Sequence, residues 1–427
     1  MTETAAKAVD DAENWLRRNP VTADRRAWLE KLVDSGWAAP SWPEEWFGRG
    51  LPPDVARATD AVFRTARPSD HASVDTEQSD PGFGGEAPQG WGQDVVNLWA
   101  ATIVSHASDD LKGQILRDLL LGNISMCLLY SEPGAGSDLA AIRTSAVRDG
   151  DEWIINGQKV WTSGGRSADY ALLITRTDLD QPKHRGISFF FFPMKQAGVE
   201  VRPLRQATGD ARFNEVFITD ARVPAANMLG ELNGGWWVLT SALAYERAAM
   251  GATQRRGQNV ATSQIVRDAS SEAPAPTPDL ALLDLARSHG RAKDPVIRQD
   301  LMRLYEWRAL NEWNNRRAKA AIEQGTTTPV VSLGKLAMSR MLHFAGSLQA
   351  EILGAESMLG AASSPEAGDA TYAMLNAFFT SIGGGTDQIQ RNIIAERILG
   401  LPKEPETDKA IPFREVVTGK VADRSSN

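Results

Sequence analysis

Apolar residues recur at every third or fourth position in four stretches near the start of the chain, which is the spacing of an amphipathic helix. Pro40 and Pro43 follow the second stretch and are expected to end its helix. Residues 68–95 are rich in Pro, Gly, Asp and Ser, which predicts a long loop. We therefore expect an N-terminal helical domain over residues 1–124. The four stretches are residues 12–18, 25–37, 95–104 and 111–123.

The hydrophobic pattern changes from Cys127 to about Trp237, where short apolar runs are separated by turn residues. The Asp-Gly pair at 149–150 and the Asn-Gly pair at 156–157 predict two hairpin turns. Because no helical pattern interrupts the runs, they predict a mostly antiparallel β-domain over residues 125–235 and exclude a Rossmann unit. The runs lie within residues 148–164, 170–177, 186–194, 199–205 and 213–224.

Helical spacing returns after Gly234 and continues to about residue 400. A Ser- and Pro-rich insert at 270–278 separates the first of these helices from the next element. We expect a C-terminal helical domain over residues 236–405 and a loose polar tail over residues 406–427. The predicted fold class is therefore α+β, with an N-terminal helical domain, a central antiparallel β-domain and a C-terminal helical bundle. The C-terminal helical stretches are residues 236–260, 295–325, 332–354 and 385–400.

Composition and charge narrow the function classes. The chain has 427 residues, of which 42% are hydrophobic, and this is enough for more than one domain. Its net charge of −8 and its lack of dense Lys or Arg runs argue against a nucleic-acid partner. The single cysteine, Cys127, excludes an intrachain disulfide and a thiolate metal site. Because the five histidines also form no metal-binding motif, we expect no metal site.

The sequence shows no targeting signal of a familiar kind. The acidic N-terminus lacks the apolar core of a signal peptide. No apolar run approaches the ~18 residues that a membrane span needs. We therefore expect a cytoplasmic protein with no membrane partner.

Two segments of the β-domain combine small, aromatic and hydroxyl residues in a way that suits a ligand. Residues 131–138 (SEPGAGSD) predict a Gly-rich loop whose backbone N–H groups a ligand can approach closely, although an ordinary turn is the alternative. Trp161 is followed by Thr162 and Ser163. Its indole can pack on a flat heteroaromatic ring while the hydroxyls bind the edge of that ring. The alternative is a core tryptophan on a strand.

Glu246 lies in the middle of the apolar stripe of the first C-terminal helix. The stripe is Leu239, Ala242, Leu243, Glu246, Ala249 and Met250. Burial raises the pKa of a carboxyl group, which suits a general base that works near neutrality. The alternative is a structural ion pair with an arginine in the core.

Three consecutive glycines at 383–385 precede a further predicted helix, with Thr386 as its N-cap. A helix N-terminus that is approached through glycine exposes N–H groups, which can bind an anion or polarise a carbonyl. A plain loop-to-helix junction is the alternative.

Taken together and in this order, these segments resemble the acyl-CoA dehydrogenase family. Residues 131–165 are similar to its flavin-facing signature, and residues 213–237 are similar to the crossing into its C-terminal helices. Residues 351–355 (EILGA) and 385–400 (GTDQIQRNIIAERILG) resemble its C-terminal flavin segments. The resemblance covers roughly residues 30–67 and 100–400 and is weak at 68–95 and 255–300. It implies FAD as the cofactor and an acyl-CoA thioester as the substrate.

The resemblance also implies a place for each site residue. Tyr130, Ser131 and Ser137 would line the flavin, with Ser137 also on the CoA side of the substrate. Trp161, Thr162 and Ser163 would lie against the isoalloxazine, with Ser163 near N5. Further FAD contacts, from the same or a neighbouring subunit, would be Arg287, Glu351, Ile352, Leu353, Gly354, Thr386 and Gln388. Arg287, in ARSHGRA, stands in for an arginine that the family carries in R-x-x-F-G. The remaining substrate contacts would be Tyr245, Arg247 and Gly385.

The catalytic base is displaced relative to most of the family. Most members carry it in a Y-E-G-T segment, which here reads Gly383, Gly384, Gly385, Thr386 and has no carboxylate. A minority that resembles isovaleryl-CoA and long-chain dehydrogenases carries the base in an L-x-x-E-R context. Here that context is Leu243 to Arg247, which assigns the base to Glu246. The two departures compensate each other.

The resemblance implies that Glu246 removes the α-proton while the β-hydride passes to flavin N5. The N–H of Gly384 and a ribityl hydroxyl would bind the thioester carbonyl, and an electron-transfer flavoprotein would accept the electrons. A homodimer, homotetramer or hetero-oligomer is expected. The alternatives are a non-catalytic helper subunit of a hetero-oligomeric dehydrogenase and an acyl-CoA oxidase. The small residues Gly383 and Gly384 favour a branched or bulky acyl group, of steroid or aryl type.

Overall fold

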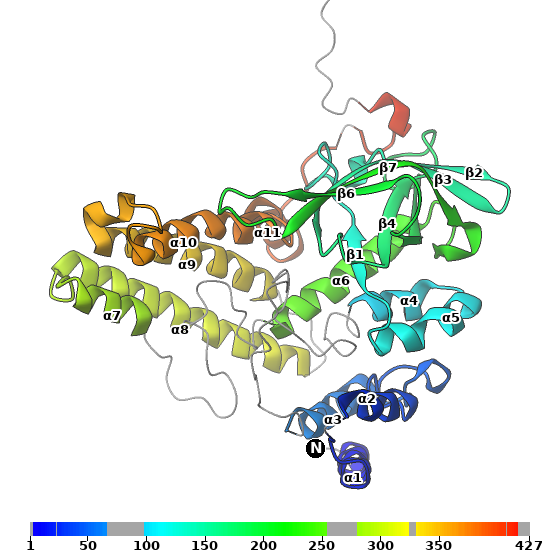
Figure 1. Cartoon of the computed structure of the whole chain (residues 1–427), viewed down its shortest axis with the longest axis horizontal. Coiled ribbons are helices and arrows are strands. Elements are labelled where there is room, and N and C mark those ends of the chain that lie inside the picture. Colours follow the sequence, from blue (N-terminus) through cyan, green and yellow to red (C-terminus); the bar gives the residue numbers. More distant parts are fainter. Residues whose placement is uncertain are drawn as a thin grey trace, which may run out of the picture. The chain divides into compact units, whose positions relative to one another are not determined.

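The computed structural model describes residues 3–22, 24–65, 98–253, 280–323, 330–406 and 408–416. The chain divides into two compact units (Figure 1). The first unit contains Met1–Arg205, Ala211–Gly251 and Thr407–Asn427, and the second contains Gln206–Asp210 and Ala252–Glu406. The predicted loop at 68–95 and the predicted insert at 270–278 lie outside the described residues.

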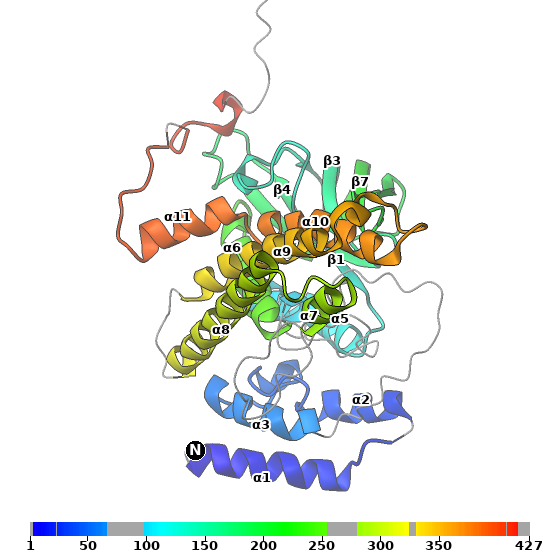
Figure 2. The same ribbon diagram turned by 90° about the vertical axis from the view of Figure 1, so that its left-hand side faces the viewer.

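The first unit begins with short helices whose bounds follow capping residues. Asp24 accepts a hydrogen bond from Ala27 N at the start of α2, and Ser108 accepts one from Leu111 N at the start of α5. Helices α1 and α3 lie side by side (Figure 2). The helices are α1 (Glu3–Arg18), α2 (Arg25–Asp34), α3 (Pro53–Thr65), α4 (Ala100–His106) and α5 (Asp109–Leu120).

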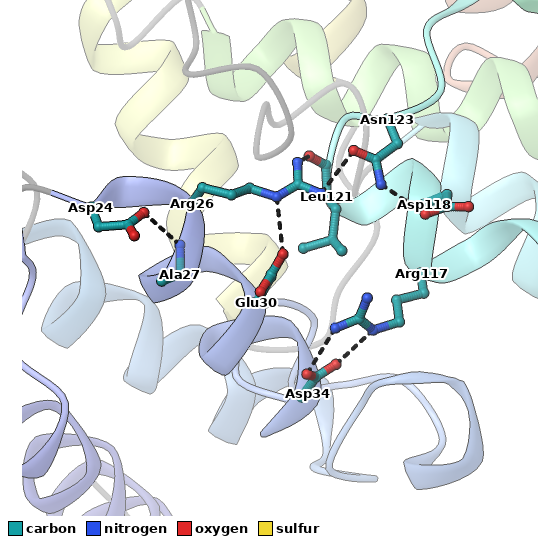
Figure 3. Close-up of polar contacts among 9 residues, drawn as sticks. All are labelled: Asp24, Arg26, Ala27, Glu30, Asp34, Arg117, Asp118, Leu121 and Asn123. Carbon is teal, nitrogen blue, oxygen red and sulfur yellow. Dashed lines mark hydrogen bonds and ion pairs between the residues drawn. The ribbon is translucent and has the colours of Figure 1, made fainter.

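Polar contacts join α2 to α5 across more than eighty residues of sequence (Figure 3). Arg117 donates two hydrogen bonds of 2.9 Å to the carboxylate of Asp34. Arg26 donates to the carbonyl of Leu121 and to Asn123, each at 2.8 Å. Because these side chains are exposed, we assign them the role of fixing the register of the two helices rather than a large share of stability.

The β-domain is one eight-stranded sheet with the order β6-β7-β3-β2-β4-β5-β8, and β1 pairs with β4. The β1–β4 and β2–β4 pairs are parallel and the others are antiparallel, which confirms the predicted mostly antiparallel domain. The strands are β1 (Met126–Leu129), β2 (Ser145–Asp149), β3 (Glu152–Ser163), β4 (Tyr170–Arg176), β5 (Ile187–Pro193), β6 (Val199–Leu204), β7 (Phe213–Pro224) and β8 (Met228–Leu229).

One of the two predicted hairpin turns is wrong. The turn at 149–150 joins β2 to β3, but Asn156 and Gly157 lie inside β3, where the pairing with β7 shifts register. A Cβ on Gly157 would lie 2.3 Å from Thr144 Oγ1, so this glycine allows a close approach between neighbouring strands. Asn156 donates a hydrogen bond of 2.9 Å to Asp220. The Asn-Gly pair therefore marks a β-bulge and not a turn.

Four consecutive phenylalanines on β5 bury both faces of the sheet. Phe189 and Phe191 pack into a core with the N-terminal helices, and Phe190 and Phe192 pack into a second core within the β-domain. Successive side chains of a strand point to opposite faces, so an unbroken aromatic run is the pattern of a strand that is covered on both sides.

Helix α6 (Gly235–Thr253) leaves the sheet and packs on the first core through Leu239, Val238 and Trp236. The second unit is helical, and α9 contacts α8, α10 and α11 (Figures 1 and 2). Sequence reasoning did not separate α7 or α10 as elements. The helices of this unit are α7 (Leu280–Ser288), α8 (Pro295–Glu323), α9 (Val330–Leu353), α10 (Pro365–Ile382) and α11 (Asp387–Arg397).

The architecture confirms the predicted α+β class. None of the helices in the described ranges is long and apolar enough to cross a membrane. The domain bounds at 124, 235 and 405 stay predictions, since the two compact units do not test them.

The C-terminal segment corrects the expectation of a loose tail for residues 408–416. Phe413 is buried against the first unit, its ring centroid 3.8 Å from the Arg176 guanidinium, and its N–H donates to Gln181 O at 2.9 Å. Asp408 accepts a hydrogen bond of 2.9 Å from Lys183. One buried aromatic ring and two ion pairs, Lys183 with Asp408 and Arg414 with Asp180, therefore hold a segment whose polar composition predicted no structure.

We predict that Phe413→Ala lowers the free energy of unfolding by about 3 kcal/mol, because the substitution empties a buried aromatic site. Urea unfolding followed by circular dichroism measures the change. Arg414→Ala is the matched control, since its ion pair with Asp180 is exposed and is expected to contribute less than about 1 kcal/mol. Equal effects of the two substitutions would contradict the anchoring role of the ring.

Candidate functional site

The loop of residues 131–138 follows β1 directly and is closed on itself. Glu132 and Ala135 exchange two backbone hydrogen bonds of 2.9 and 3.0 Å. Ser137 is exposed, and a Cβ on Gly134 or Gly136 would meet nothing within 4 Å. The loop therefore presents small residues and backbone on an open surface, as the sequence predicted.

Residues 161–163 lie at the second β-bulge of β3, where its pairing with β7 shifts between Lys159 and Thr162. Trp161 has a φ of 64° and its side chain is 57% exposed. A positive φ is a costly conformation for a bulky side chain, so the expectation of an ordinary core tryptophan is excluded. The indole packs edge to face with Phe213, at 5.7 Å between ring centroids.

The two residues after Trp161 carry hydroxyl groups in different surroundings. Ser163 is half-buried. The Oγ1 atom of Thr162 is buried and has no hydrogen-bond partner among the described residues. Because buried hydroxyl groups are nearly always paired, such an atom beside an exposed indole is a candidate ligand contact.

A buried ion pair joins the loop of residues 131–138 to strand β3. Lys159 Nζ donates to Glu132 Oε1 at 2.8 Å and to the carbonyl of Tyr130 at 3.1 Å. Arg143 N donates to Glu132 Oε2 at 2.7 Å, and Thr144 N donates to Oε1 at 2.9 Å. Sequence reasoning missed this pair, although both residues lie in the quoted segments, because nothing in their spacing shows that they meet.

The surroundings of the pair hold it in its charged form. Burial by itself would raise the pKa of the Glu132 carboxyl, but the Lys159 ammonium and the hydrogen bonds from Thr144 and Arg143 lower it below its usual range. Burial lowers the pKa of Lys159, and the neighbouring Glu132 opposes that shift. Removing one partner would leave the other charge buried without compensation.

Glu246 lies in α6 as expected. Leu239 and Ala242 of the predicted stripe are fully buried and Leu243 is half-buried, so the apolar face of the helix is confirmed up to the turn before Glu246. The side chains of Glu246 and Arg247 lie outside the described residues. The assignment of the base therefore stays a prediction.

Tyr245 is tied to the N-terminal helices. Its hydroxyl lies 2.8 Å from Ser105 Oγ, at the end of α4. This contact across 140 residues of sequence fixes the turn of α6 that carries Glu246. A substrate contact by Tyr245 stays a prediction.

The glycines before α11 adopt conformations that favour glycine. Gly384 and Gly385 have φ values of 65° and 85°. Thr386 caps α11, with its Oγ1 accepting a hydrogen bond of 3.2 Å from Ile389 N, as predicted. Gln388 is exposed, and the N–H of Gly384 has no hydrogen-bond acceptor among the described residues.

The predicted FAD contacts at 351–354 lie at the end of α9, where Gly354 has a φ of 60°. Arg287 is exposed and pairs with Asp284 at 2.9 Å. Arg291 approaches the segment instead, donating to the carbonyl of Glu351 at 3.5 Å. Arg291 is therefore a second candidate for the expected arginine, and sequence reasoning missed it because it searched for one fixed spacing.

A metal ligand set was not expected. Within the described ranges, the ligand atoms of His289, Glu356 and Glu366 all lie within 4.8 Å of one another. His289 Nε2 lies 3.4 Å from Glu356 and 3.3 Å from Glu366, and all three side chains are partly or well exposed. Exposed carboxylates beside a histidine are common without a metal ion, so this cluster carries no assignment.

The predicted residues thus fall into two groups. Tyr130, Ser131, Ser137 and residues 161–163 lie in the first unit with Tyr245, Glu246 and Arg247. Lys159 binds Tyr130 O and Glu132, and Val160 N donates to Ser131 O, so residues 130–132 are linked to β3. The second unit holds the other group: Arg287, Glu351, Ile352, Leu353, Gly354, Gly384, Gly385, Thr386 and Gln388.

Known proteins are similar to this chain in both sequence and fold. It is 33% identical over 397 residues to the acyl-CoA dehydrogenase IpdE1 of Mycobacterium tuberculosis, covering 91% of each chain. It is 30% identical over 394 residues to the acyl-CoA dehydrogenase FadE26 of the same organism, covering 88% of each. Among solved structures, the steroid ACAD Tcur3481-Tcur3483 has a TM-score of 0.65 and 27% identity, covering 94% of this chain and 96% of that one.

A second solved structure, the ChsE4-ChsE5 complex from Mycobacterium tuberculosis, has a TM-score of 0.60 and 26% identity, covering 95% of this chain and 99% of that one. Two family models also match the chain. The acyl-CoA dehydrogenase middle domain matches residues 127–221, and the acyl-CoA dehydrogenase C-terminal domain matches residues 281–399. The chain belongs to the acyl-CoA dehydrogenase family.

Proposed function

We propose that the protein catalyses the FAD-dependent α,β-dehydrogenation of an acyl-CoA thioester to the 2-enoyl-CoA, with Glu246 as the base. The observation that carries the proposal is the strained, exposed Trp161 beside the partnerless hydroxyl of Thr162. A conformation of this cost persists where a ligand uses it. In a member of the acyl-CoA dehydrogenase family, that ligand is proposed to be FAD.

The described residues fit such a cofactor. The indole of Trp161 offers a flat apolar face, and Thr162 and Ser163 offer hydroxyl groups for polar edge atoms. Ser131, Ser137 and the open glycines of the loop 131–138 would hold the cofactor on the other side. The second group, with Thr386, Gln388, Arg287 and residues 351–354, is proposed to hold FAD of the same or a neighbouring subunit.

Glu246 supports the proton-transfer half of the reaction. It follows the buried Leu239 and Ala242 on one helix face, and a carboxylate at the edge of an apolar stripe is a stronger base than one in water. It would remove the α-proton and keep it as the neutral acid. Bound FAD supplies the acceptor for the β-hydride.

The N–H of Gly384 supports the activation of the substrate. The thioester carbonyl gains negative charge as the α-proton leaves, and an unpaired N–H just before α11 would donate to it. The positive end of the α11 dipole adds to this effect. Because the donor is a backbone group, the absence of a side chain at 384 does not remove it.

The absence of side chains at 383–385 also favours a bulky substrate. A steroid ACAD is among the similar structures, and it shares 27% of the sequence. We propose an acyl-CoA with a ring system or a branched acyl chain, and an electron-transfer flavoprotein as the electron acceptor. A hetero-oligomer is the proposed alternative to a homo-oligomer, since one similar structure is the ChsE4-ChsE5 complex.

We predict that Glu246→Gln retains yellow FAD but bleaches about 10³-fold more slowly with acyl-CoA, because the variant has no α-proton acceptor. Anaerobic stopped-flow absorbance at the flavin band measures the rate. Glu231→Gln, on an exposed turn of the same unit, controls for the loss of a negative charge. Wild-type bleaching in Glu246→Gln would assign the base to another residue.

We predict that Gly384→Glu raises the bleaching rate of the Glu246→Gln variant by about tenfold, because it restores a carboxylate at the position that most of the family uses. Gly384→Gln on the same background is the matched control, since it carries the same backbone cost of a side chain at a φ of 65°. If both double variants bleach at the same rate, the two positions do not serve one α-carbon.

We predict that the wild-type enzyme prefers acyl-CoAs with a ring or branch over straight short chains by about tenfold in kcat/KM, a ratio that pocket volume alone can supply. A panel of cyclic, branched and straight acyl-CoAs with an artificial electron acceptor measures this. A preference for butyryl-CoA would refute the bulky-substrate proposal and leave the enzyme class intact. Peroxide formed at the turnover rate would instead indicate an oxidase.

A further inference from the structure

We infer that Glu132 and Lys159 are positioning residues that hold the loop 131–138 and residues 160–163 at a fixed separation. These two segments are the two sides of the proposed flavin site, so the inference rests on the proposed function. The pair itself is not proposed to touch substrate or cofactor. Its role is to keep Ser131 and Trp161, which are proposed to do so, in one relative arrangement.

The contacts of the pair connect both segments within a few bonds of the proposed ligand groups. Lys159 lies two residues before Trp161, and its ammonium group binds the carbonyl of Tyr130, the residue before Ser131. Val160 N donates to Ser131 O at 2.9 Å, so the backbone link and the side-chain link lie side by side. A shift of one segment relative to the other would therefore lengthen or bend at least one of these hydrogen bonds.

Glu132 fixes the loop from its other end. Its carboxylate accepts hydrogen bonds from the N–H groups of Arg143 and Thr144, which lie just before β2. The loop is thus held at β3 through Lys159 and at β2 through two backbone donors. Between these anchors, Gly134, Gly136 and Ser137 are exposed, and the buried Ala135 exchanges two backbone hydrogen bonds with Glu132.

The burial of the pair argues for a geometric role over a purely stabilising one. Lys159 is fully buried and Glu132 is 8% exposed, and a buried ion pair is on average no more stable than an apolar pair of similar volume. Unlike an apolar pair, the charged pair makes directional contacts, because each hydrogen bond fixes the position of one donor relative to one acceptor. The second buried cation nearby, Arg176, binds the carbonyls of Ala140 and Lys183 and does not replace either contact.

The strained backbone at Trp161 requires support from neighbouring contacts, and the pair supplies part of that support. A β-bulge and a φ of 64° persist only where the surroundings over-determine the backbone. On one side of the bulge lie Lys159 and Val160 with their contacts to residues 130–132. On the other side, Asn214 Nδ2 donates to Thr162 O at 2.9 Å. The bulge is therefore clamped from both ends.

The test compares Glu132→Gln, Lys159→Met and the double variant that carries both substitutions. Each single variant leaves an uncompensated or mispaired buried group, whereas the double variant is neutral and close to the original volume. A structural role predicts that the double variant regains every property of the wild type. A positioning role predicts that it regains thermal stability and not the local geometry.

Asp169→Asn is the matched control. Asp169 accepts hydrogen bonds from Lys195 and Ser125 at the start of β1, at the opposite end of that strand from Ser131. Burial would raise its pKa, but these partners lower it to about 2, so it is also an ionised carboxylate held by a lysine in the β-domain. Its loss is expected to change stability without reaching residues 131–138.

Two measurements report on position. In the protein without added FAD, hydrogen exchange of amides in peptides that cover 131–138 and 160–163 is expected to be about tenfold faster in the double variant, while peptides that cover 187–193 stay protected. In the FAD-loaded protein, the flavin reduction potential is expected to shift and bleaching to slow by about ten- to a hundredfold, at unchanged acyl-CoA affinity. Asp169→Asn is expected to match the wild type in both measurements.

The outcomes separate the two proposals. Wild-type exchange, potential and bleaching in the double variant would overturn the positioning role and leave the proposed function standing. A wild-type protein that binds FAD but is not bleached by any acyl-CoA would overturn the proposed reaction. The exchange data would still decide whether the pair holds the two segments, because they require no turnover. If the single variants do not fold, the double variant and Asp169→Asn suffice for the comparison.

Discussion

The burial of both faces of one sheet is the constraint on which the other features of the first unit depend. Phe189 and Phe191 face the helical core, and Phe190 and Phe192 face the β-domain core, so a one-residue slip of β5 would exchange the two sets. Exposing any of these rings to water would cost free energy, so both faces of the sheet stay covered. Strands β1 and β4, which pair beside β5, therefore have a fixed register, and the loop 131–138 begins at a fixed point.

The candidate site is built where this rigid sheet ends. The loop 131–138 leaves β1, and the bulge at Trp161 interrupts β3, so both proposed ligand segments are irregular backbone attached to regular strands. Irregular backbone keeps a fixed ligand-binding geometry only if contacts from the surrounding structure hold it in place. The buried pair of Glu132 and Lys159 connects these segments.

The residues proposed for the reaction belong to both units. The first unit offers a hydrophobic helix face for Glu246 and an aromatic surface at Trp161, and the second offers an unpaired N–H at Gly384 before a capped helix. The proposed reaction needs a base at Glu246 and a hydrogen-bond donor at Gly384, and the α11 dipole would strengthen such a donor. Substitutions at one position thus test the other, since the proposed reaction needs both at one α-carbon.

The sequence by itself determined the order of elements, the family resemblance and the residue types of the candidate site. Periodicity and local motifs are short-range properties of the chain, and the strands β4 to β7 follow them closely. Only the tertiary structure decided that Asn156 and Gly157 form a bulge, that Phe413 is buried, and that Glu132 meets Lys159. Each of these depends on a partner that is distant in sequence, and burial and pairing energies of such contacts override local preference.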